Sequence, residues 1–224
     1  MIVPEPGLRV LDVGCGTGIS TRGLLEAGAE VVAIDPNDAM RSAAERNLTG
    51  PDVPLTLAHG SGESTGQADA AFDRVLCAQS FHWFHADRAL AEFRRVLRPD
   101  GALVLMWNDR DRRGAAAAAY EAIVLEAQQY TEAQGRRAPP LRAYAPSPAQ
   151  GFEVVATHDF DNPQSFDHDA LRGRLLSASY MPKDGPMHTK LLAALDALYH
   201  AHAEDGIVTL AQRAQLTVCR PLAT

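Results

Sequence analysis

The strongest constraint on the fold is a glycine-rich turn between an apolar run and a helical segment. Residues 8–13 are mostly apolar and have the length of a buried strand, and Gly14, Gly16 and Gly18 follow directly. Residues 19–27 then have the pattern of a helix. Glycine lets the backbone turn sharply and approach a ligand without an intervening Cβ. The succession predicts a strand, a ligand-binding turn and a helix that begins at that turn.

Strand-like and helical segments continue to alternate through the first half of the chain. Expected strands cover residues 30–35, 55–59, 74–78 and 102–107, and expected helices cover residues 38–47 and 86–97, with a turn at 99–101. Such alternation implies right-handed crossovers and a mainly parallel sheet with helices on both faces. We therefore expect an α/β, Rossmann-like, doubly wound fold.

The second half of the chain has a different pattern. Helices are expected at 115–130, 169–179 and 189–203, and strands at 152–160 and 207–219, the second of which the pattern allows to be either continuous or broken. The two strands would complete a seven-stranded sheet, and the helices would form a small C-terminal cap. A length of 224 residues suits one α/β domain with such a cap. We expect a single domain in which residues 1–110 form the ligand-binding core and residues 111–224 add the helical insertions and last strands.

Composition and charge argue against several classes of protein. The formal net charge is −7, whereas a nucleic-acid-binding surface needs clustered Lys and Arg. No apolar run approaches the roughly 20 residues that span a bilayer. The three cysteines leave an odd thiol, and neither they nor the histidines have the spacing of metal ligands. Since no signal peptide is visible, we expect a cytoplasmic protein without a membrane segment, a nucleic-acid partner or a metal.

The glycine spacing distinguishes two classes of ligand. A dinucleotide-binding turn has the pattern G-x-G-x-x-G, whereas here Ile19 takes the sixth position and Gly18 comes one residue early. The second strand ends in Asp35, where a carboxylate can accept hydrogen bonds from both hydroxyls of a ribose. Taken alone, Asp35 is equally compatible with a helix cap. Together with the turn, it predicts a ligand that joins an amino acid to a nucleoside.

These segments carry a family resemblance. Residues 11–18 resemble motif I of the class I methyltransferases that use S-adenosylmethionine (SAM), and residues 32–35 resemble the acidic second strand of that family. Residues 72–84 resemble the fourth strand and loop of its small-molecule, type 11 branch, which includes relatives of the ubiquinone-biosynthesis and trans-aconitate methyltransferases. Residues 95–101 and 107–108 are similar to the segments around the fifth strand. The resemblance covers the first half of the chain well.

The resemblance implies a SAM site at the matching residues. Asp12 would anchor the turn, Asp35 would bind the ribose, and Gln79 would lie beside the methionine moiety. Glu63 is also compatible with a surface acid whose main chain alone meets the adenine. The implied cofactor-binding residues are Asp12, Gly14, Cys15, Gly16, Gly18, Asp35, Pro36, Met40, Ser61, Gly62, Glu63 and Gln79. Relatives usually have a helical segment before the first strand, which this chain reaches within seven residues; we expect that segment to be absent, replaced by later helices or lost through a misplaced start.

The methyl acceptor is expected at the carboxyl ends of the fourth and fifth strands, because ligands of open α/β sheets bind there. The candidate pocket residues are Phe81, His82, Trp83, Trp107 and Asn108, with Tyr180 near the end of a later helix beside Ser177 and Ser179. His82 is the candidate general base, although it could instead only orient the loop. The acceptor atom, whether oxygen, nitrogen or carbon, is left open.

The sequence thus favours a SAM-dependent methyltransferase that acts on a small molecule by in-line displacement. Three alternatives remain. A non-catalytic SAM-binding module would have a filled acceptor site, and an NAD-dependent oxidoreductase is disfavoured by the glycine spacing. A macromolecular substrate is disfavoured by the negative charge and by the lack of an appended recognition domain.

Overall fold

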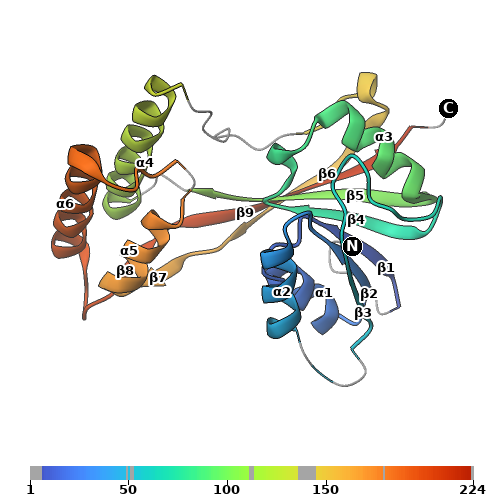
Figure 1. Ribbon diagram of the computed structural model, residues 1–224, viewed down its shortest axis with the longest axis horizontal. Coiled ribbons are helices and arrows are strands. Elements are labelled where there is room, and N and C mark those ends of the chain that lie inside the picture. The colour runs from blue at the N-terminus through green and yellow to red at the C-terminus, as the bar shows by residue number, and fades with distance from the viewer. Residues whose placement is uncertain are drawn as a thin grey trace. The chain divides into compact units, whose positions relative to one another are not determined.

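The computed structural model describes residues 7–48, 50, 53–110, 114–135, 145–178 and 180–222. These residues form a seven-stranded sheet with the strand order β3-β2-β1-β4-β5-β9-β6 (Figure 1). Its strands are β1 (Arg9–Val13), β2 (Glu30–Ile34), β3 (Leu55–Ala58), β4 (Phe72–Ala78), β5 (Leu97–Arg110), β6 (Phe152–Asp161) and β9 (Gln212–Pro221). All neighbouring pairs from β3 to β5 are parallel, so the expected Rossmann-like, mainly parallel sheet is confirmed.

Strand β1 lies at the point where the strand order reverses. Leu11 of β1 is in register with Val32 of β2 on one side and with Val75 of β4 on the other. From there β2 and β3 continue to one side of β1, whereas β4 and β5 continue to the other. Ligands of open α/β sheets bind outside the carboxyl ends of the strands at such a reversal. The topology therefore places a site after β1, β2 and β4.

Helices cover both faces of the sheet because successive strand residues point to opposite sides. Val10 belongs to an apolar cluster against which Leu24 of α1 (Ile19–Glu26) packs. The next residue, Leu11, belongs to a second cluster that includes Phe93 of α3 (Ala86–Val96). Figure 1 shows α1 and α3 on opposite sides of the sheet. Apolar residues on both faces of one strand are what a buried parallel strand requires.

The structure differs from one expectation about the strands and agrees with another. The turn expected at Pro99–Gly101 is wrong, since these residues lie inside β5. The pairing of β5 with β4 shifts from Leu97–Phe72 to Ala102–Arg74, and the extra residues bulge out of the ladder, so they deform the strand instead of ending it. The expected last strand is broken, as the sequence allowed, into β8 (Val208–Leu210) and β9.

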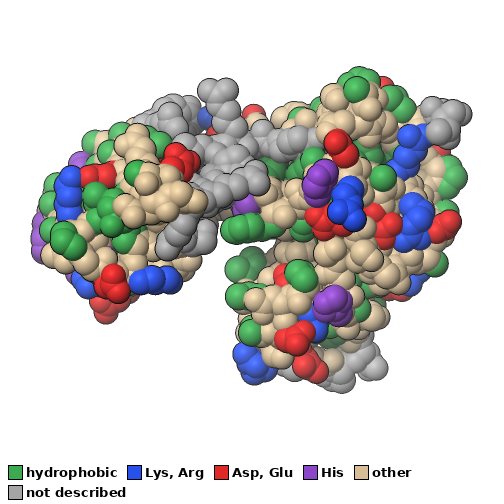
Figure 2. Space-filling model, turned by 45° about the horizontal axis from the view of Figure 1, so that its top comes forward, with side chains coloured by type: hydrophobic (Ala, Val, Ile, Leu, Met, Phe, Trp, Pro, Cys, Tyr) green, Lys and Arg blue, Asp and Glu red, His purple; other side chains and the backbone are tan. Residues whose placement is uncertain are grey.

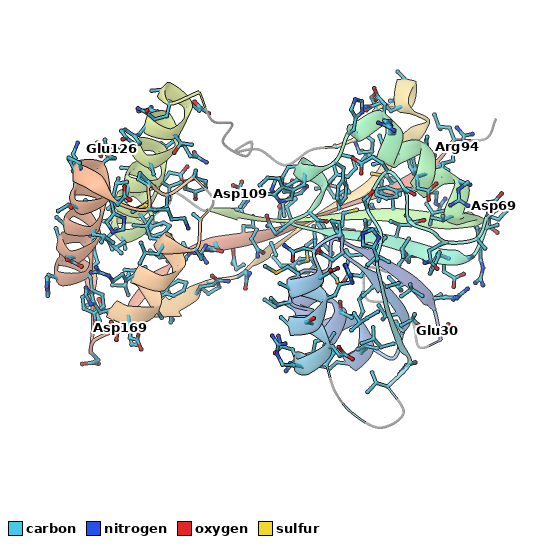
Figure 3. All side chains as sticks on the ribbon, viewed as in Figure 1. Glu30, Asp69, Arg94, Asp109, Glu126 and Asp169 are labelled. Carbon is cyan, nitrogen blue, oxygen red and sulfur yellow. The ribbon has the colours of Figure 1, made fainter. Side chains whose placement is uncertain are left out.

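The chain divides into two compact units. The first comprises Met1–Trp107, Ala143–His158 and Gln215–Thr224, and the second comprises Asn108–Arg142 and Asp159–Ala214. The second has an apolar core of its own. Glu126, labelled in Figure 3, forms an ion pair with Lys190 at the surface of this unit. Its elements are α4 (Ala115–Ala133), β7 (Gln164–Phe166), α5 (His168–Leu176), α6 (Gly185–His202) and β8, with β7 and β8 antiparallel. The expected single domain, with a core of residues 1–110 and added segments in residues 111–224, stays a prediction.

Replacing Phe93 with alanine should lower the free energy of unfolding by about 3–5 kcal/mol, because it empties a buried site on α3. Phe93 is 0% exposed, and its ring centroid lies 6.3 Å from that of Phe81 and 6.2 Å from that of Phe84. Phe160→Ala is the matched control, since that ring is 48% exposed and should cost at most about 0.5 kcal/mol. Urea unfolding followed by circular dichroism measures both; equal losses would contradict the assigned core.

Candidate functional site

The turn after β1 carries the three glycines, and each has a positive φ. The values are 72° at Gly14, 57° at Gly16 and 88° at Gly18, in a region that residues with a Cβ rarely adopt. A Cβ on Gly14 would lie 2.6 Å from the Cβ of Ser80, so the turn packs directly against the segment after β4. A Cβ on Gly16 would meet no atom of the described residues within 4 Å. At Gly16, therefore, a ligand can approach the backbone.

Most N–H groups of this turn are already used within the protein. Gly14 and Cys15 both donate to the carbonyl of Ile34, at 2.8 and 3.1 Å. Gly16 donates to Oδ2 of Asp35 at 3.0 Å. A pyrophosphate site needs such N–H groups free to bind anionic oxygens. Three donors that a pyrophosphate would need are thus occupied, which disfavours a dinucleotide.

Asp35 follows β2, and two main-chain donors fix its carboxylate. Oδ2 accepts from Gly16, and Oδ1 accepts from the N–H of Asn37 at 2.8 Å. Each carboxylate oxygen can accept more than one hydrogen bond, so both oxygens keep capacity for ligand hydroxyls. The helix α2 (Asp38–Asn47) is capped by Asn37, whose Oδ1 accepts from the N–H of Ala39 at 2.9 Å. The reading of Asp35 as the side-chain cap of this helix is thereby excluded.

Asp12 on β1 is fully buried, and one of its two oxygens is unpaired. Oδ2 accepts from the hydroxyls of Ser20 at 2.8 Å and Thr21 at 2.7 Å, which ties β1 to the first turn of α1. Oδ1 has no partner among the described residues. Burial raises the pKa of Asp12 to about 6, helped by the charge of Asp35 and opposed by the two hydroxyls. A cation at Oδ1 would offset this desolvation, so the position favours a positively charged ligand group.

Gln79, directly after β4, has a strained backbone and an unpaired side chain. Its φ of 57° is unusual for a residue other than glycine. Its N–H donates to the carbonyl of Met106 on β5 at 2.9 Å, whereas Nε2 is buried without a partner in the described part of the chain. Residues held in such conformations cluster at functional sites. Gln79 thus places a buried donor at the carboxyl edge of the sheet.

The segment after β3 is held by its own contacts. Gly62 lies so close to the Phe84 ring that a Cβ would approach it to 2.6 Å. Oε1 of Glu63 accepts from the N–H of His85 at 2.6 Å. Burial acts to raise the pKa of Glu63, but hydrogen bonds from His85, its own main chain and Ser61 outweigh it and lower the pKa. The Glu63 side chain therefore fastens the loop after β4, which leaves main-chain atoms of this segment for a nucleobase.

Three other predicted cofactor residues have simple surroundings. Pro36 and Met40 are exposed at the start of α2, where an adenine ring could lie against them. The thiol of Cys15 is buried, and burial, with smaller effects of Asp12 and Asp35, raises its pKa to about 12. A thiol with so high a pKa is neutral and unreactive at physiological pH. No group of three potential metal ligands lies close together within the described ranges.

The loop after β4 divides its aromatic residues between core and surface. Phe81 is 2% exposed, and its ring centroid lies 5.9 Å from that of Phe84 and 6.3 Å from that of Phe93. Its expected place in the acceptor pocket is therefore corrected: the short 3-10 helix η1 (Phe81–Trp83) turns this ring into the core. Trp83, two residues on, is 66% exposed.

His82 lies between two tryptophan rings. Its ring centroid is 4.9 Å from that of Trp83 and 5.7 Å from that of Trp107, a residue of β5. Burial lowers the pKa of His82. Its imidazole is therefore mostly neutral at pH 7 and can accept a proton. These contacts give the candidate base a fixed aromatic environment.

The other predicted acceptor residues belong to the second unit. Oδ1 of Asn108 accepts from Nδ2 of Asn162 at 3.3 Å. The carbonyl of Tyr180 accepts from the hydroxyl of Thr131 at 2.6 Å. Ser179 lies outside the described residues. The structure thus assigns Asn108 and Tyr180 contacts within their own unit.

Several hydroxyl residues that hold the site were missed from the sequence. Ser20 and Thr21 bind Asp12, and the buried Ser80 donates from Oγ to the carbonyl of Val13 at 2.5 Å. Hydroxyl side chains that directly follow a glycine turn or a strand end are the signal that could have pointed to them. Their role is to fix the acid and the turn, since small hydroxyls can bond to nearby backbone and side chains.

Comparisons with known proteins identify the family. Residues 11–105 match the family described as a methyltransferase domain. An uncharacterized methyltransferase of Mycobacterium tuberculosis is 34% identical over 203 residues, covering 90% of this chain and 77% of that protein. The ubiquinone/menaquinone biosynthesis C-methyltransferase UbiE of Bordetella avium is 38% identical over 118 residues, or 51% of this chain and 46% of that protein. A proposed type II methyltransferase from Anaeromyxobacter dehalogenans shares the fold, with a TM-score of 0.66 at 24% identity over 100% of this chain and 93% of that one.

The chain therefore belongs to the class I SAM-dependent methyltransferases. It is an enzyme, and SAM is its methyl donor. The residues present fit that ligand. The unpaired Oδ1 of Asp12 suits an ammonium group, the unpaired Nε2 of Gln79 suits a carboxylate, and Gly16 leaves open space beside the main chain.

Gly16→Ala should weaken binding of S-adenosylhomocysteine, the demethylated form of SAM, by about tenfold or more, because a methyl group would enter the open space. Alanine held at a φ of 57° should also lower the free energy of unfolding by about 1–2 kcal/mol. Gly7→Ala is the matched control: its φ is 86° and its Cβ would also meet nothing within 4 Å, but it precedes β1. Calorimetric titration compares the two; equal affinity losses would contradict the ligand position.

Asp12→Asn should stabilise the unbound protein at high pH while weakening ligand binding. The folded pKa of about 6 lies above the ordinary 3.8, so the wild type loses stability as pH rises through this window. Above it the loss reaches about 3 kcal/mol. Asparagine keeps an oxygen for Ser20 and Thr21 but carries no charge. Urea unfolding should give the variant a higher free energy of unfolding than wild type, by a larger difference at pH 8 than at pH 5. Affinity for S-adenosylhomocysteine should fall about tenfold; a variant less stable than wild type at pH 8 would refute this account.

Proposed function

We propose that this methyltransferase holds SAM at the turn after β1 and transfers the methyl group to a small molecule. The observation that carries the proposal is the polarity of the turn. The N–H groups of Gly14, Cys15 and Gly16 are used inside the protein, while Oδ1 of the buried Asp12 has no partner among the described residues. A matching ligand brings a cation to Asp12 and hydroxyls to Asp35. A sulfonium amino acid joined to a nucleoside offers both, whereas the pyrophosphate of NAD would be repelled by the two carboxylates.

In the proposed complex, each part of SAM meets a group of complementary polarity. Oδ1 of Asp12 and the carbonyl of Gly14, whose own N–H is used elsewhere, would accept from the ammonium group. Nε2 of Gln79 would donate to the carboxylate, and Asp35 would accept from the ribose hydroxyls. The adenine ring lies among the other predicted residues, Pro36, Met40, Ser61, Gly62 and Glu63.

The protein has to align the acceptor and exclude water, since bound SAM supplies the electrophilic methyl group. His82 is the proposed general base. Because its imidazole is neutral and partly desolvated, it can take a proton from a hydroxyl or amine as that atom becomes methylated. Trp83 and Trp107 line the acceptor on either side of His82. Asn108 and Tyr180, which belong to the second unit, are left out of this site.

A small acceptor is favoured over a nucleic acid by the distribution of charge. The net charge is −7, and Figure 2 shows acidic and basic side chains intermixed on the face in view. Arg95 pairs with the exposed Asp69, and Arg98 pairs with Asp73, both at 2.5 Å. Phosphate binding draws on clustered basic residues, and these arginines are already paired with acids. The similarity to UbiE, which is named for ubiquinone/menaquinone biosynthesis, also favours a small acceptor.

We place the protein in the cytoplasm. Cys15, Cys77 and Cys219 are free and buried, which suits a reducing compartment. None of the helices in the described ranges is long and apolar enough to cross a membrane.

A metabolite screen tests the proposed function. Purified protein and SAM are incubated with fractionated metabolite extracts, and products heavier by one methyl group are sought by mass spectrometry. We expect one or a few small acceptors, and a rate about 100-fold lower for His82→Asn at unchanged affinity for S-adenosylhomocysteine. His158→Asn, on β6, is the control and should keep the wild-type rate. Binding of the cofactor without any methylated product would favour the non-catalytic module.

A further inference from the structure

Trp107 carries a buried donor that the described residues leave unpaired. The residue is 6% exposed, and its Nε1 has no hydrogen-bond partner in that part of the chain. Buried tryptophans usually pair this N–H. Packing alone does not account for the choice of residue, because phenylalanine or leucine would fill an apolar position without burying a donor. An unpaired indole N–H therefore points to a ligand atom.

The position of Trp107 relates this donor to the proposed site. The preceding residue, Met106, is in register with Ala78 of β4, and its carbonyl accepts from Gln79. Trp107 is thus one residue beyond the point where β5 bonds to the end of β4. Its ring lies next to His82, which in turn lies next to the exposed Trp83. The ring that carries this donor therefore lies beside the proposed general base, in a group of three rings.

We propose, resting on the proposed function, that Trp107 is a specificity-determining residue that recognises the methyl acceptor through an oxygen atom. Nε1–H donates a hydrogen bond to that oxygen, while the planar body of the acceptor packs against the rings of Trp83, His82 and Trp107. An indole N–H only donates, so the ligand atom has to accept, as a carbonyl, carboxylate or phenol oxygen does. Aromatic rings pack favourably with centroids about 4.5–7 Å apart, which makes a ring-bearing acceptor the best match.

The experiment observes the indole N–H directly by nuclear magnetic resonance. The chain has two tryptophans, so ¹⁵N-labelled protein gives two indole signals, which Trp83→Phe assigns without altering Trp107. The complex with S-adenosylhomocysteine is titrated with 4-methylphenol, benzoate and acetophenone, and with toluene as the matched probe without oxygen. We expect at least one oxygen-bearing probe to shift the Trp107 signal downfield to saturation, and toluene, which packs on the same rings without an acceptor atom, to cause no downfield shift. Trp107→Phe should weaken that oxygen-bearing probe about tenfold and leave toluene unchanged.

Three results would overturn the inference while the proposed function stands. The Trp107 signal could ignore all three oxygen-bearing probes in the cofactor complex. S-adenosylhomocysteine alone could shift it to its final position, which would assign the donor to the cofactor. Trp107→Phe could weaken binding of toluene and of the oxygen-bearing probes equally, which would mean that Trp107 contributes only by stacking. Failure of S-adenosylhomocysteine to bind, measured first by calorimetry, would instead overturn the proposed function and this inference together.

Discussion

The site depends on the hydrogen bonds between the glycine turn and the end of β2. Main-chain donors of Gly14 and Cys15 bind the carbonyl of Ile34, and Gly16 binds the carboxylate of Asp35. These bonds hold the turn in its positive-φ conformation, keep Gly16 open and orient Oδ2 of Asp35. A site fixed in this way before its ligand arrives loses less conformational freedom on binding. They also remove the donors that would otherwise make the turn an anion site.

Two carboxylates then give the site its electrostatic character. Asp35 is bonded at both oxygens yet keeps acceptor capacity, whereas Asp12 is buried with one oxygen unpaired. Burial of Asp12, which raises its pKa to about 6, places a desolvated charge inside the folded protein at neutral pH. Such a residue trades stability for function, because a bound cation provides the missing interaction. In the proposed complex the ammonium group of SAM is that cation.

The three consecutive aromatic residues of the loop after β4 lie in different environments. Phe81 fills the core beside α3, His82 is half-buried, and Trp83 faces outward. The short 3-10 helix η1 causes this separation, since it turns successive side chains to different sides. Trp107 of β5 contacts His82 of this loop, so the rings around the proposed base come from β5 and from the loop after β4.

The sequence by itself determined the architecture of the first unit and the chemical identity of its loops. The pattern of apolar residues predicted the bounds of β1 to β4 to within two residues. The glycine spacing together with Asp35 identified the kind of ligand. Both signals are local in the sequence. Only the tertiary structure decided which oxygen of Asp12 is unpaired, that Phe81 is core, that β5 bulges at Pro99–Gly101 and that Trp107 buries an unpaired donor. Each of these depends on strand register and on contacts between residues far apart in the chain. A local sequence pattern does not specify such contacts.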